Sequence, residues 1–597
     1  MTTEMDLEEE FAQAPLAQAR LKRLLAYLAP YRRTMILALS LETLWVVCML
    51  VELRLIREAQ DGPVARGDIP GIALLAAAML GNIAFRAWFT VWEIRTTTRI
   101  GVQVMHAIRK DVFDHIQRLS MRYFDRTKQG RIIARADRDV DTMEHLLLWG
   151  PVVLVNMVFS MVLGFAQMCI GASSLVLWIV PAIPLLWALT RTFQKLASVA
   201  YRRVRETHSA ISAHVAETIT GVRVVMAFSA EDRELARLET RQKSYRDAVI
   251  RGVRLSGAFV PSLMFVLQAL TIVALWVGGR EVVAGHIGLG GLMELIMLIG
   301  FVLGPVEGLG GLYAESLVAG AAAERIFLLM DTKPEVQDRP GAKDPGRLRG
   351  ELEFDGVAFS YEPDGRHGRQ LDGVSFRVAP GETVALVGHT GAGKTSVVNL
   401  IARFYEAQEG TVRLDGRDIR DIPAAALHRQ MGMVLQESFL FAGSVLDNLR
   451  FVRPDLTEDE ARRGFEELGC GEVLRGLSQG LATDVGERGA NLSEGERQIV
   501  CFVRALLARP AILILDEATS AVDTQTESLI LHALRELASR QTTVVIAHRL
   551  STIRHADRIL GMEKGRVVEQ GTHAELMQRG GTYAHLYGEY ATSGAGA

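Results

Sequence analysis

The chain has 597 residues, too many for a single hydrophobic core, so we expect it to fold as several domains. Its formal net charge of -3 argues against a general nucleic-acid-binding protein. Hydrophobic residues make up 49% of the sequence, because apolar runs of membrane-spanning length recur in the first half. The second half reads as an ordinary soluble α/β domain.

The N-terminal segment, residues 1–33, is predicted to be cytoplasmic. It opens with an acidic stretch and lacks the basic segment and apolar core of a cleavable signal peptide. Leu21, Leu24, Leu25 and Leu28 recur among basic residues, which indicates an amphipathic helix on a membrane surface. A simple packed helix is an equally good interpretation of this pattern.

Six apolar runs of about 20 residues predict six membrane-spanning helices in a transmembrane domain over residues 34–330. The predicted spans lie near 34–55, 72–92, 147–170, 174–190, 258–278 and 290–312. Buried helices of a soluble protein do not readily explain six such runs in one half of a chain. The fourth run is short and contains Pro181 and Pro184, so its ends are the least defined.

Lys and Arg residues concentrate in the two long connections, between spans two and three and between spans four and five. The connections on the opposite side contain few of them. The positive-inside rule therefore places both termini and the two long connections in the cytoplasm. The connections look helical, and the turn-like segment Tyr123–Arg131 lies at the tip of the first. We expect this tip to contact a neighbouring domain, with a solvated turn as the alternative.

Charged residues inside the predicted spans are candidates for function, because placing a charge in a membrane is costly. They are Glu42, Arg86, Glu294 and Glu307. Glu42 and Glu294 lie deepest. They are expected either to face a substrate cavity or to pair with Arg86 between helices, and the sequence does not separate these two interpretations.

A linker dotted with Pro and Gly, residues 331–350, separates the spans from a region of alternating strand-like and helix-like runs over 351–590. Residues 591–597 are expected to form a flexible tail.

The second half of the chain contains a P-loop in its expected strand–loop–helix context. An apolar strand, Val384–Val387, precedes Gly388-x-x-x-x-Gly393-Lys394-Thr395 and an apolar-striped helix. The glycines let the backbone wrap a phosphate chain, and the helix N-terminus directs N–H groups towards it. The residues expected to bind nucleotide here are Gly388, His389, Thr390, Gly391, Ala392, Gly393, Lys394, Thr395 and Ser396.

Another apolar strand ends at Asp516 and Glu517, at the edge where open α/β sheets bind ligands. Asp516 is expected to hold Mg²⁺ together with Thr395 and Gln436, and Glu517 to orient and deprotonate the attacking water. His548 ends a further strand and is expected to contact the γ-phosphate. Standing alone, Gln436 and His548 would each be interpreted as structural residues.

The P-loop, Gln436, "LSEGERQ", "LILDEATSAVD" and "IAHRL", in this order and spacing, resemble the motifs of ATP-binding-cassette (ABC) transporters. The resemblance extends from about residue 20 to residue 590. Six spans before one ATPase domain resemble an exporter-type half-transporter. The implied fold is an all-α six-helix transmembrane domain with long cytoplasmic helical extensions, followed by an α/β P-loop ATPase domain of the ABC type.

This resemblance implies a dimer in which two ATPase domains enclose two molecules of ATP, each with Mg²⁺. One chain would supply Tyr361 for adenine stacking, together with the P-loop, Gln436, Asp516, Glu517 and His548. The other chain would supply Ser493, Glu494, Gly495 and Asp523. The cytoplasmic hairpins would dock near Gln436 and carry domain closure to the spans, so that ATP binding favours an outward-open state and hydrolysis resets it.

The signature motif departs from the usual Leu-Ser-Gly-Gly-Gln, because Glu494 and Glu496 stand at its third and fifth positions. Ser493 and Gly495, the members that face the phosphate, are present. Altered signatures also mark heterodimeric exporters, so the sequence favours a heterodimer slightly over a homodimer. Ser493 and Glu496 form a capping box as well, which leaves the second negative charge, on Glu494, without an explanation.

The implied function is ATP-driven export of hydrophobic or amphipathic compounds, such as drugs, lipids or peptides, by alternating access. The expected partners are a second half-transporter, membrane lipids and the cargo, without nucleic acid, in a bacterial cytoplasmic membrane. An exporter-fold importer of a siderophore or vitamin and a nucleotide-gated channel are the alternatives, although Glu517 argues against a channel. The six spans exclude a soluble cassette ATPase acting on DNA or ribosomes.

Overall fold

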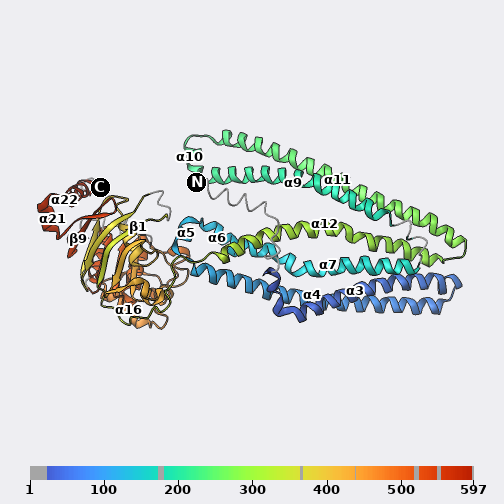
Figure 1. The fold of residues 1–597 in the computed structure, drawn as a ribbon, viewed down its shortest axis with the longest axis horizontal. Coiled ribbons are helices and arrows are strands. Elements are labelled where there is room, and N and C mark those ends of the chain that lie inside the picture. Colours follow the sequence, from blue (N-terminus) through green and yellow to red (C-terminus); the bar gives the residue numbers. More distant parts are fainter. Residues whose placement is uncertain are drawn as a thin grey trace. The chain divides into compact units, whose positions relative to one another are not determined.

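The computed structural model describes residues 23–171, 176, 180–362, 368–436, 438–516, 524–538, 540–546 and 553–594 (Figure 1). The chain forms two compact units. The first, called the membrane unit below, comprises Met1–Gln117 and Gln129–Thr332. The second, the ATPase unit, comprises Arg118–Lys128 and Lys333–Ala597, so the tip of the first cytoplasmic hairpin belongs to it.

The described residues of the membrane unit are helical, and several helices continue without a break from apolar into charged sequence. Helices α9 and α11 lie side by side and are joined through α10 (Figure 1). The helices are η1 (Ala29–Tyr31), α3 (Arg32–Ala59), η2 (Gln60–Val64), α4 (Ile69–Arg118), α6 (Gln129–Ala136), α7 (Arg138–Gly171), α9 (Ala182–Thr220), α10 (Val222–Ala227), α11 (Glu231–Val283) and α12 (Leu289–Asp331).

Within the described residues, four helical stretches are long and apolar enough to cross a membrane. They are Ala29–Val64, Ile69–Arg118, Gln129–Gly171 and Glu231–Val283, and they contain the first, second, third and fifth predicted spans. A shorter apolar stretch, Leu289–Pro305, coincides with the start of the sixth. The fourth predicted span lies partly outside the described residues, so the count of six spans stays a prediction.

The carboxylate of Glu294 joins three helices of the membrane unit. Glu294 is 2% exposed, and Oε2 of its carboxylate accepts a hydrogen bond of 3.0 Å from Nη1 of Arg57 on α3. Its Oε1 accepts one of 2.5 Å from Nε2 of Gln167 on α7. A buried carboxylate needs such hydrogen-bond partners. The contacts of Glu294 with Arg57 and Gln167 therefore hold α3, α7 and α12 together.

Asp61 extends this network to the N-terminus of α12. Its carboxylate accepts hydrogen bonds from the backbone N–H groups of Gly290 and Gly291, at 2.7 and 3.2 Å. Nε of Arg57 lies 3.7 Å from the same carboxylate. Asp61 therefore satisfies helix-end donors and places a negative charge at the positive end of the helix dipole.

Two other charged residues of the predicted spans, Arg86 and Glu42, have partners of their own. Arg86 pairs with Glu52 at 2.8 Å rather than with Glu42 or Glu294. Glu42 accepts a hydrogen bond from the neutral side chain of Asn156. The side chain of Glu307 lies outside the described residues. The pairing with Arg86 that the sequence allowed is thus replaced by other contacts, because the sequence does not fix which helix faces meet.

The ATPase unit contains two sheets in its described residues. One has the order β10-β9-β3-β8-β7-β6 and is parallel except for β10, and the other, β2-β1-β4-β5, is antiparallel. The strands are β1 (Leu352–Phe359), β2 (Leu371–Val378), β3 (Thr383–Val387), β4 (Glu409–Leu414), β5 (Arg417–Asp418), β6 (Met431–Val434), β7 (Ile512–Asp516), β8 (Thr542–Ile546), β9 (Arg558–Glu563) and β10 (Arg566–Gly571).

The central strands are apolar on both faces because each face meets a separate core. On β7, Ile512 and Ile514 belong to the core that also contains the antiparallel sheet, whereas Leu513 and Leu515 belong to the core formed with α18. Such two-sided burial is typical of parallel strands covered by helices. It explains the uninterrupted apolar runs in the sequence.

Helices of the ATPase unit start at residues that the sequence marks clearly. Four begin with complete capping boxes, formed by Ser444 with Asp447, Thr457 with Glu460, Ser493 with Glu496 and Thr572 with Glu575. The described helices are α5 (Met121–Arg126), α13 (Lys394–Ile401), η3 (Ile419–Asp421), α14 (Ala424–His428), α15 (Val445–Arg450), α16 (Glu458–Glu467), α17 (Gly471–Gly476), η4 (Gly480–Ala482), η5 (Glu487–Gly489), α18 (Glu494–Leu507), α19 (Thr524–Ala538), α21 (His573–Arg579) and α22 (Thr582–Gly594).

Replacing Arg57 with Met is expected to destabilise the membrane unit by about 3–5 kcal/mol, because it leaves the Glu294 carboxylate buried beside fewer positive charges. The measurement is thermal unfolding in detergent, followed by far-UV circular dichroism. Arg54→Met is the matched control, since its side chain is 47% exposed and lies 3.8 Å from Glu294. We expect that control to lose no more than about 1 kcal/mol. Equal losses for the two variants would contradict this account.

Candidate functional site

The P-loop leaves β3 and enters α13 through a turn that requires glycine. Gly393 has φ +104°, a left-handed conformation that residues with a side chain rarely adopt. A Cβ there would lie 2.8 Å from the carbonyl oxygen of Gln370, and one at Gly388 would collide with the carbonyl oxygen of Met562. The two glycines therefore let the loop pass close to neighbouring backbone, and the predicted wrapping of a phosphate chain stays a prediction.

The first residues of α13 carry the cation and the hydroxyl expected at a phosphate site. Lys394 is 6% exposed, and its Nζ donates hydrogen bonds to the carbonyl oxygens of Gly388 (2.6 Å) and His389 (3.1 Å). The ammonium group thus lies over the loop, where phosphate oxygens can replace the carbonyls as acceptors. Thr395 is exposed at the helix start. These groups fit a nucleotide triphosphate carrying a divalent cation.

The remaining residues of the P-loop differ in their exposure to solvent. His389 and Thr390 are exposed, Ala392 is buried, and Ser396 is buried with its hydroxyl donating to Oη of Tyr361 at 3.3 Å. His389 and Thr390 are therefore the loop side chains that a ligand can reach. Ser396 is held by a protein contact, and its predicted contact with nucleotide stays a prediction.

Tyr361, the residue expected to stack on adenine, is anchored to α13. Its hydroxyl accepts a hydrogen bond of 2.9 Å from Nδ2 of Asn399. Its ring meets Phe359 and Tyr405 edge-on, with centroid distances of 4.8 and 5.0 Å. The side chain is half-buried, so part of the ring remains accessible. Its stacking on adenine stays a prediction.

The ends of β6, β7 and β8 bring the expected catalytic segments to one edge of the parallel sheet. Asp516 is the last residue of β7 and pairs with Ile546, the last residue of β8. Gln436 follows β6 and is exposed. Glu517 directly follows the last residue of β7, and His548 stands two residues after the last residue of β8, but both lie outside the described residues. Their assigned roles therefore stay predictions.

Ser493 is the N-cap of α18, and the predicted capping box is confirmed. Its Oγ accepts a hydrogen bond of 3.3 Å from the backbone N–H of Glu496. In return, Oε2 of Glu496 accepts 2.8 Å hydrogen bonds from the backbone N–H and the hydroxyl of Ser493. The Glu496 carboxylate is thus folded back on the cap. Ser493 is exposed, and Gly495 is buried in the first turn of the helix.

Glu494 forms an ion pair with Arg497, one turn further along α18. Arg497 also donates hydrogen bonds to the carbonyl oxygens of Gly489 (3.2 Å) and Leu492 (3.3 Å), which fix its guanidinium group. The negative charge that the sequence left unexplained is thus neutralised within the same chain. The i,i+3 spacing of a carboxylate and an arginine is the signal that points to this pair. Asp523 lies outside the described residues.

The hairpin tip lies in the ATPase unit as helix α5, which agrees with its expected contact to a domain. Asp125 accepts a hydrogen bond from the hydroxyl of Tyr405, and Nη2 of Arg126 donates one of 3.4 Å to the carbonyl oxygen of Tyr361. Burial raises the pKa of Tyr405, and the hydrogen bond to Asp125 raises it further, so the phenol remains a donor. A docking position near Gln436 stays a prediction.

Comparison with protein families gives two adjacent matches. The model of the ABC transporter transmembrane region matches residues 35–306, and the ABC transporter model matches residues 371–520. An uncharacterized ABC transporter ATP-binding protein of Bacillus subtilis is 35% identical over 98% of this chain and 97% of its own length. The two matched regions correspond to the helical unit and to the unit with the P-loop.

Two further relatives are named for an activity. A multidrug efflux ATP-binding/permease protein of Mycobacterium bovis is 34% identical over 94% of this chain and 47% of its own length. A fatty acid ABC transporter ATP-binding/permease protein of the same species is 35% identical over 87% of this chain and 82% of its own. Among solved structures, a bacterial Atm1-family ABC exporter with ATP bound matches 94% of this chain and 99% of its own, with a TM-score of 0.77 and 28% identity.

Glu494→Gln is expected to lower the KM for ATP about 2- to 5-fold, because Arg497 is then without its counter-ion and attracts the phosphates of ATP, as exposed charge pairs do by about 0.2–1 kcal/mol. The double variant Glu494→Gln/Arg497→Gln should return the KM towards the wild-type value. The measurement is steady-state ATP hydrolysis in nanodiscs. Glu472→Gln, at a side chain 80% exposed, is the control. A KM that stays lowered in the double variant would show that Arg497 does not neutralise the Glu494 charge.

Proposed function

This chain belongs to the ABC transporter family, and we propose that it exports hydrophobic or amphipathic compounds across a bacterial cytoplasmic membrane by alternating access. ABC ATP-binding domains couple ATP hydrolysis to transport, and here the ATPase unit and the membrane unit form one polypeptide. The observation that carries the proposal is the presence, in one chain, of a complete P-loop and of helices long and apolar enough to span a membrane.

Export rather than import is supported by the relatives. One of them is named for multidrug efflux, and the similar solved structure is that of an exporter. A fatty acid transporter among the relatives is compatible with a lipid-like cargo. The cargo class we propose therefore includes drugs, lipids and peptides. Uptake of a siderophore or vitamin, or a nucleotide-gated conductance, would be recognised by the direction of flux in vesicles and by single-channel recording.

Each of the expected site residues of the ATPase unit has a separate role in the proposed reaction. Lys394 exchanges its loop carbonyls for phosphate oxygens. Thr395, Gln436 and Asp516 would hold Mg²⁺, which offsets the negative charge of the phosphates when it is bound. Glu517 orients and deprotonates the attacking water, and His548 contacts the γ-phosphate. Tyr361 stacks on the adenine.

The signature motif supports a dimer as the active form. Ser493 is exposed at the N-terminus of α18, where the backbone N–H groups and the dipole suit a phosphate from a second chain. Gly495, Glu494 and Asp523 would complete that surface. We favour a heterodimer slightly because the signature is altered. The Glu494–Arg497 pair supports a homodimer as the second candidate, since it removes the charge penalty of the altered position.

We expect Glu517→Gln to lower kcat for ATP hydrolysis by about 10²–10⁴-fold while ATP still binds, because the variant lacks the general base. The measurement is phosphate release from the chain expressed alone, purified and placed in nanodiscs. A stable homodimer with normal hydrolysis that the variant abolishes would contradict the heterodimer. Hydrolysis that survives in Glu517→Gln would contradict the proposed role of Glu517.

Glu42 is the better of the two candidates for contact with cargo, since its hydrogen-bond partner Asn156 is neutral whereas Glu294 is paired with Arg57. Glu42→Gln is expected to reduce the transport of a cationic dye into inside-out vesicles and to leave a neutral dye unaffected. Glu58→Gln, at a side chain 55% exposed on the same helix, is the control. Unchanged transport of every cationic compound in Glu42→Gln and Glu294→Gln would remove both residues from the substrate cavity.

A further inference from the structure

Arg403, an arginine of the ATPase unit, has a side chain that is 0% exposed. It stands two residues beyond the end of the P-loop helix α13, and its backbone has φ +51°, in the left-handed region. A buried arginine needs partners for its charge, and a residue with a side chain adopts this backbone conformation only when its surroundings hold it there. The contacts of Arg403 therefore need to be strong and specific.

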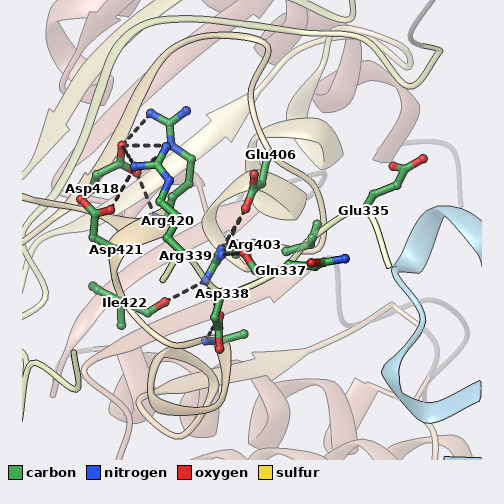
Figure 2. Close-up of polar contacts among 12 residues, drawn as sticks. Glu335, Gln337, Asp338, Arg339, Arg403, Glu406, Asp418, Arg420, Asp421 and Ile422 are labelled. Atoms are coloured by element: carbon green, nitrogen blue, oxygen red, sulfur yellow. Dashed lines mark hydrogen bonds and ion pairs between the residues drawn. The ribbon is translucent and has the colours of Figure 1, made fainter. Parts of the chain in front are cut away.

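Those contacts fasten the linker to the end of α13 (Figure 2). The guanidinium group donates hydrogen bonds to the carbonyl oxygen of Gln337 (2.9 Å) and to Oδ1 of Asp338 (3.0 Å), both in the linker. It also donates to the carbonyl oxygen of Ile422 (2.7 Å) and to Oε1 of Glu406 (3.2 Å). One cation thus bridges the P-loop helix, the linker and the segment before α14.

The linker is held on the same segment at further points. Oδ1 of Asp338 also accepts the backbone N–H of Ala424 at 2.9 Å. Arg339 forms an ion pair of 3.0 Å with Asp421, whose carbonyl oxygen accepts the backbone N–H of Lys343 at 3.2 Å. These contacts fix the linker as part of the ATPase unit rather than as a free tether (Figure 2).

The first part of the linker holds α5, the helix at the hairpin tip. Oγ of Ser120, the N-cap residue of α5, accepts hydrogen bonds from the backbone N–H groups of Glu335 (2.6 Å) and Val336 (3.1 Å). The Glu335 carboxylate forms an ion pair of 2.6 Å with Nε of Arg122 on α5. The linker therefore contacts α5 through both its backbone and a charged side chain.

The segment that follows α13 also contacts α5 directly. Tyr405, two residues after Arg403, donates a hydrogen bond to Asp125. The guanidinium carbon of Arg122 lies 5.5 Å from the centre of the Tyr405 ring, in cation–π geometry. The segment after α13, the linker and α5 thus each contact the other two. Arg403 makes the contact with the linker, and Tyr405 makes the contact with α5.

We propose that Arg403 is a positioning residue that makes α5 follow the P-loop helix. Nucleotide binds at the start of α13. When the end of α13 shifts, Arg403 moves the linker through Gln337 and Asp338, and the linker moves α5 through Glu335. Tyr405 acts on α5 in parallel. The inference rests on the proposed movement of the membrane unit in response to ATP, but not on the identity of the cargo.

The chain contains an internal reporter for this movement. Its seven tryptophans are Trp45, Trp88, Trp92, Trp149, Trp178, Trp187 and Trp276, all within the sequence of the membrane unit. The sequence of the ATPase unit contains none. Tryptophan fluorescence therefore reports the membrane unit, whereas ATP binds in the ATPase unit. A nucleotide-dependent change requires transmission between the two.

The experiment uses the full chain in nanodiscs and follows tryptophan fluorescence on addition of ATP, Mg²⁺ and vanadate. We expect Arg403→Met and Glu335→Ala to lose most of the wild-type fluorescence change while the KM for ATP stays within about 2-fold, since neither residue is expected to touch nucleotide. Arg403→Lys, which keeps the charge and a donor for Asp338, should recover part of the change. Arg420→Met is the matched control, because this arginine pairs with Asp418 within one turn at 2.6 Å.

The outcomes separate the two proposals. A wild-type response that persists in Arg403→Met and Glu335→Ala overturns the inference about Arg403 and leaves the proposed function intact. A wild-type fluorescence that ignores ATP and vanadate contradicts the proposed alternating access, and the inference falls with it. If Arg403→Met does not fold, Glu335→Ala decides, because the Glu335 side chain is 50% exposed and outside the contacts of the Arg403 guanidinium.

Discussion

The tight turn between β3 and α13 is the constraint on which the ATPase unit depends. The strand is buried on both faces, and the loop that follows passes so close to neighbouring backbone that Gly388 and Gly393 cannot carry side chains. This turn fixes the start of α13, where Lys394 lies over the loop. The segment that directly follows the same short helix contains Arg403 and Tyr405. One element therefore connects the phosphate site with the linker and with α5.

Local patterns in the sequence predict the elements of this machinery correctly. The P-loop, the capping box at Ser493 and the apolar central strands depend on a few neighbouring residues, so their structure follows from spacing and side-chain type. The long helices of the membrane unit follow from the need to satisfy backbone polar groups inside lipid. The expected roles of Glu517, His548 and Asp523 rest on the same patterns and on family resemblance.

Contacts between distant residues could not be predicted in this way. Arg57 and Glu294 are 237 residues apart, and Arg403 is 65 residues from Asp338. Helical periodicity marks a charged residue as unusual, but it does not say which helix face it meets. Arg86 illustrates the limit, since its partner is Glu52, a residue that the pattern did not distinguish. Likewise, nothing in the sequence around Arg403 indicates that its side chain is buried.

The ion pair between Glu494 and Arg497 has a consequence for how chains choose one another. Because Arg497 is the counter-ion of Glu494, the third position of the signature adds little net charge that a partner with an ordinary signature or a second copy of this chain would meet, and the negative charge that remains is that of Glu496 on the cap. The charge of Glu494 then gives little discrimination between them. In the proposed dimer, selectivity for a partner would then depend on residues other than Glu494, including surfaces that take no part in holding nucleotide.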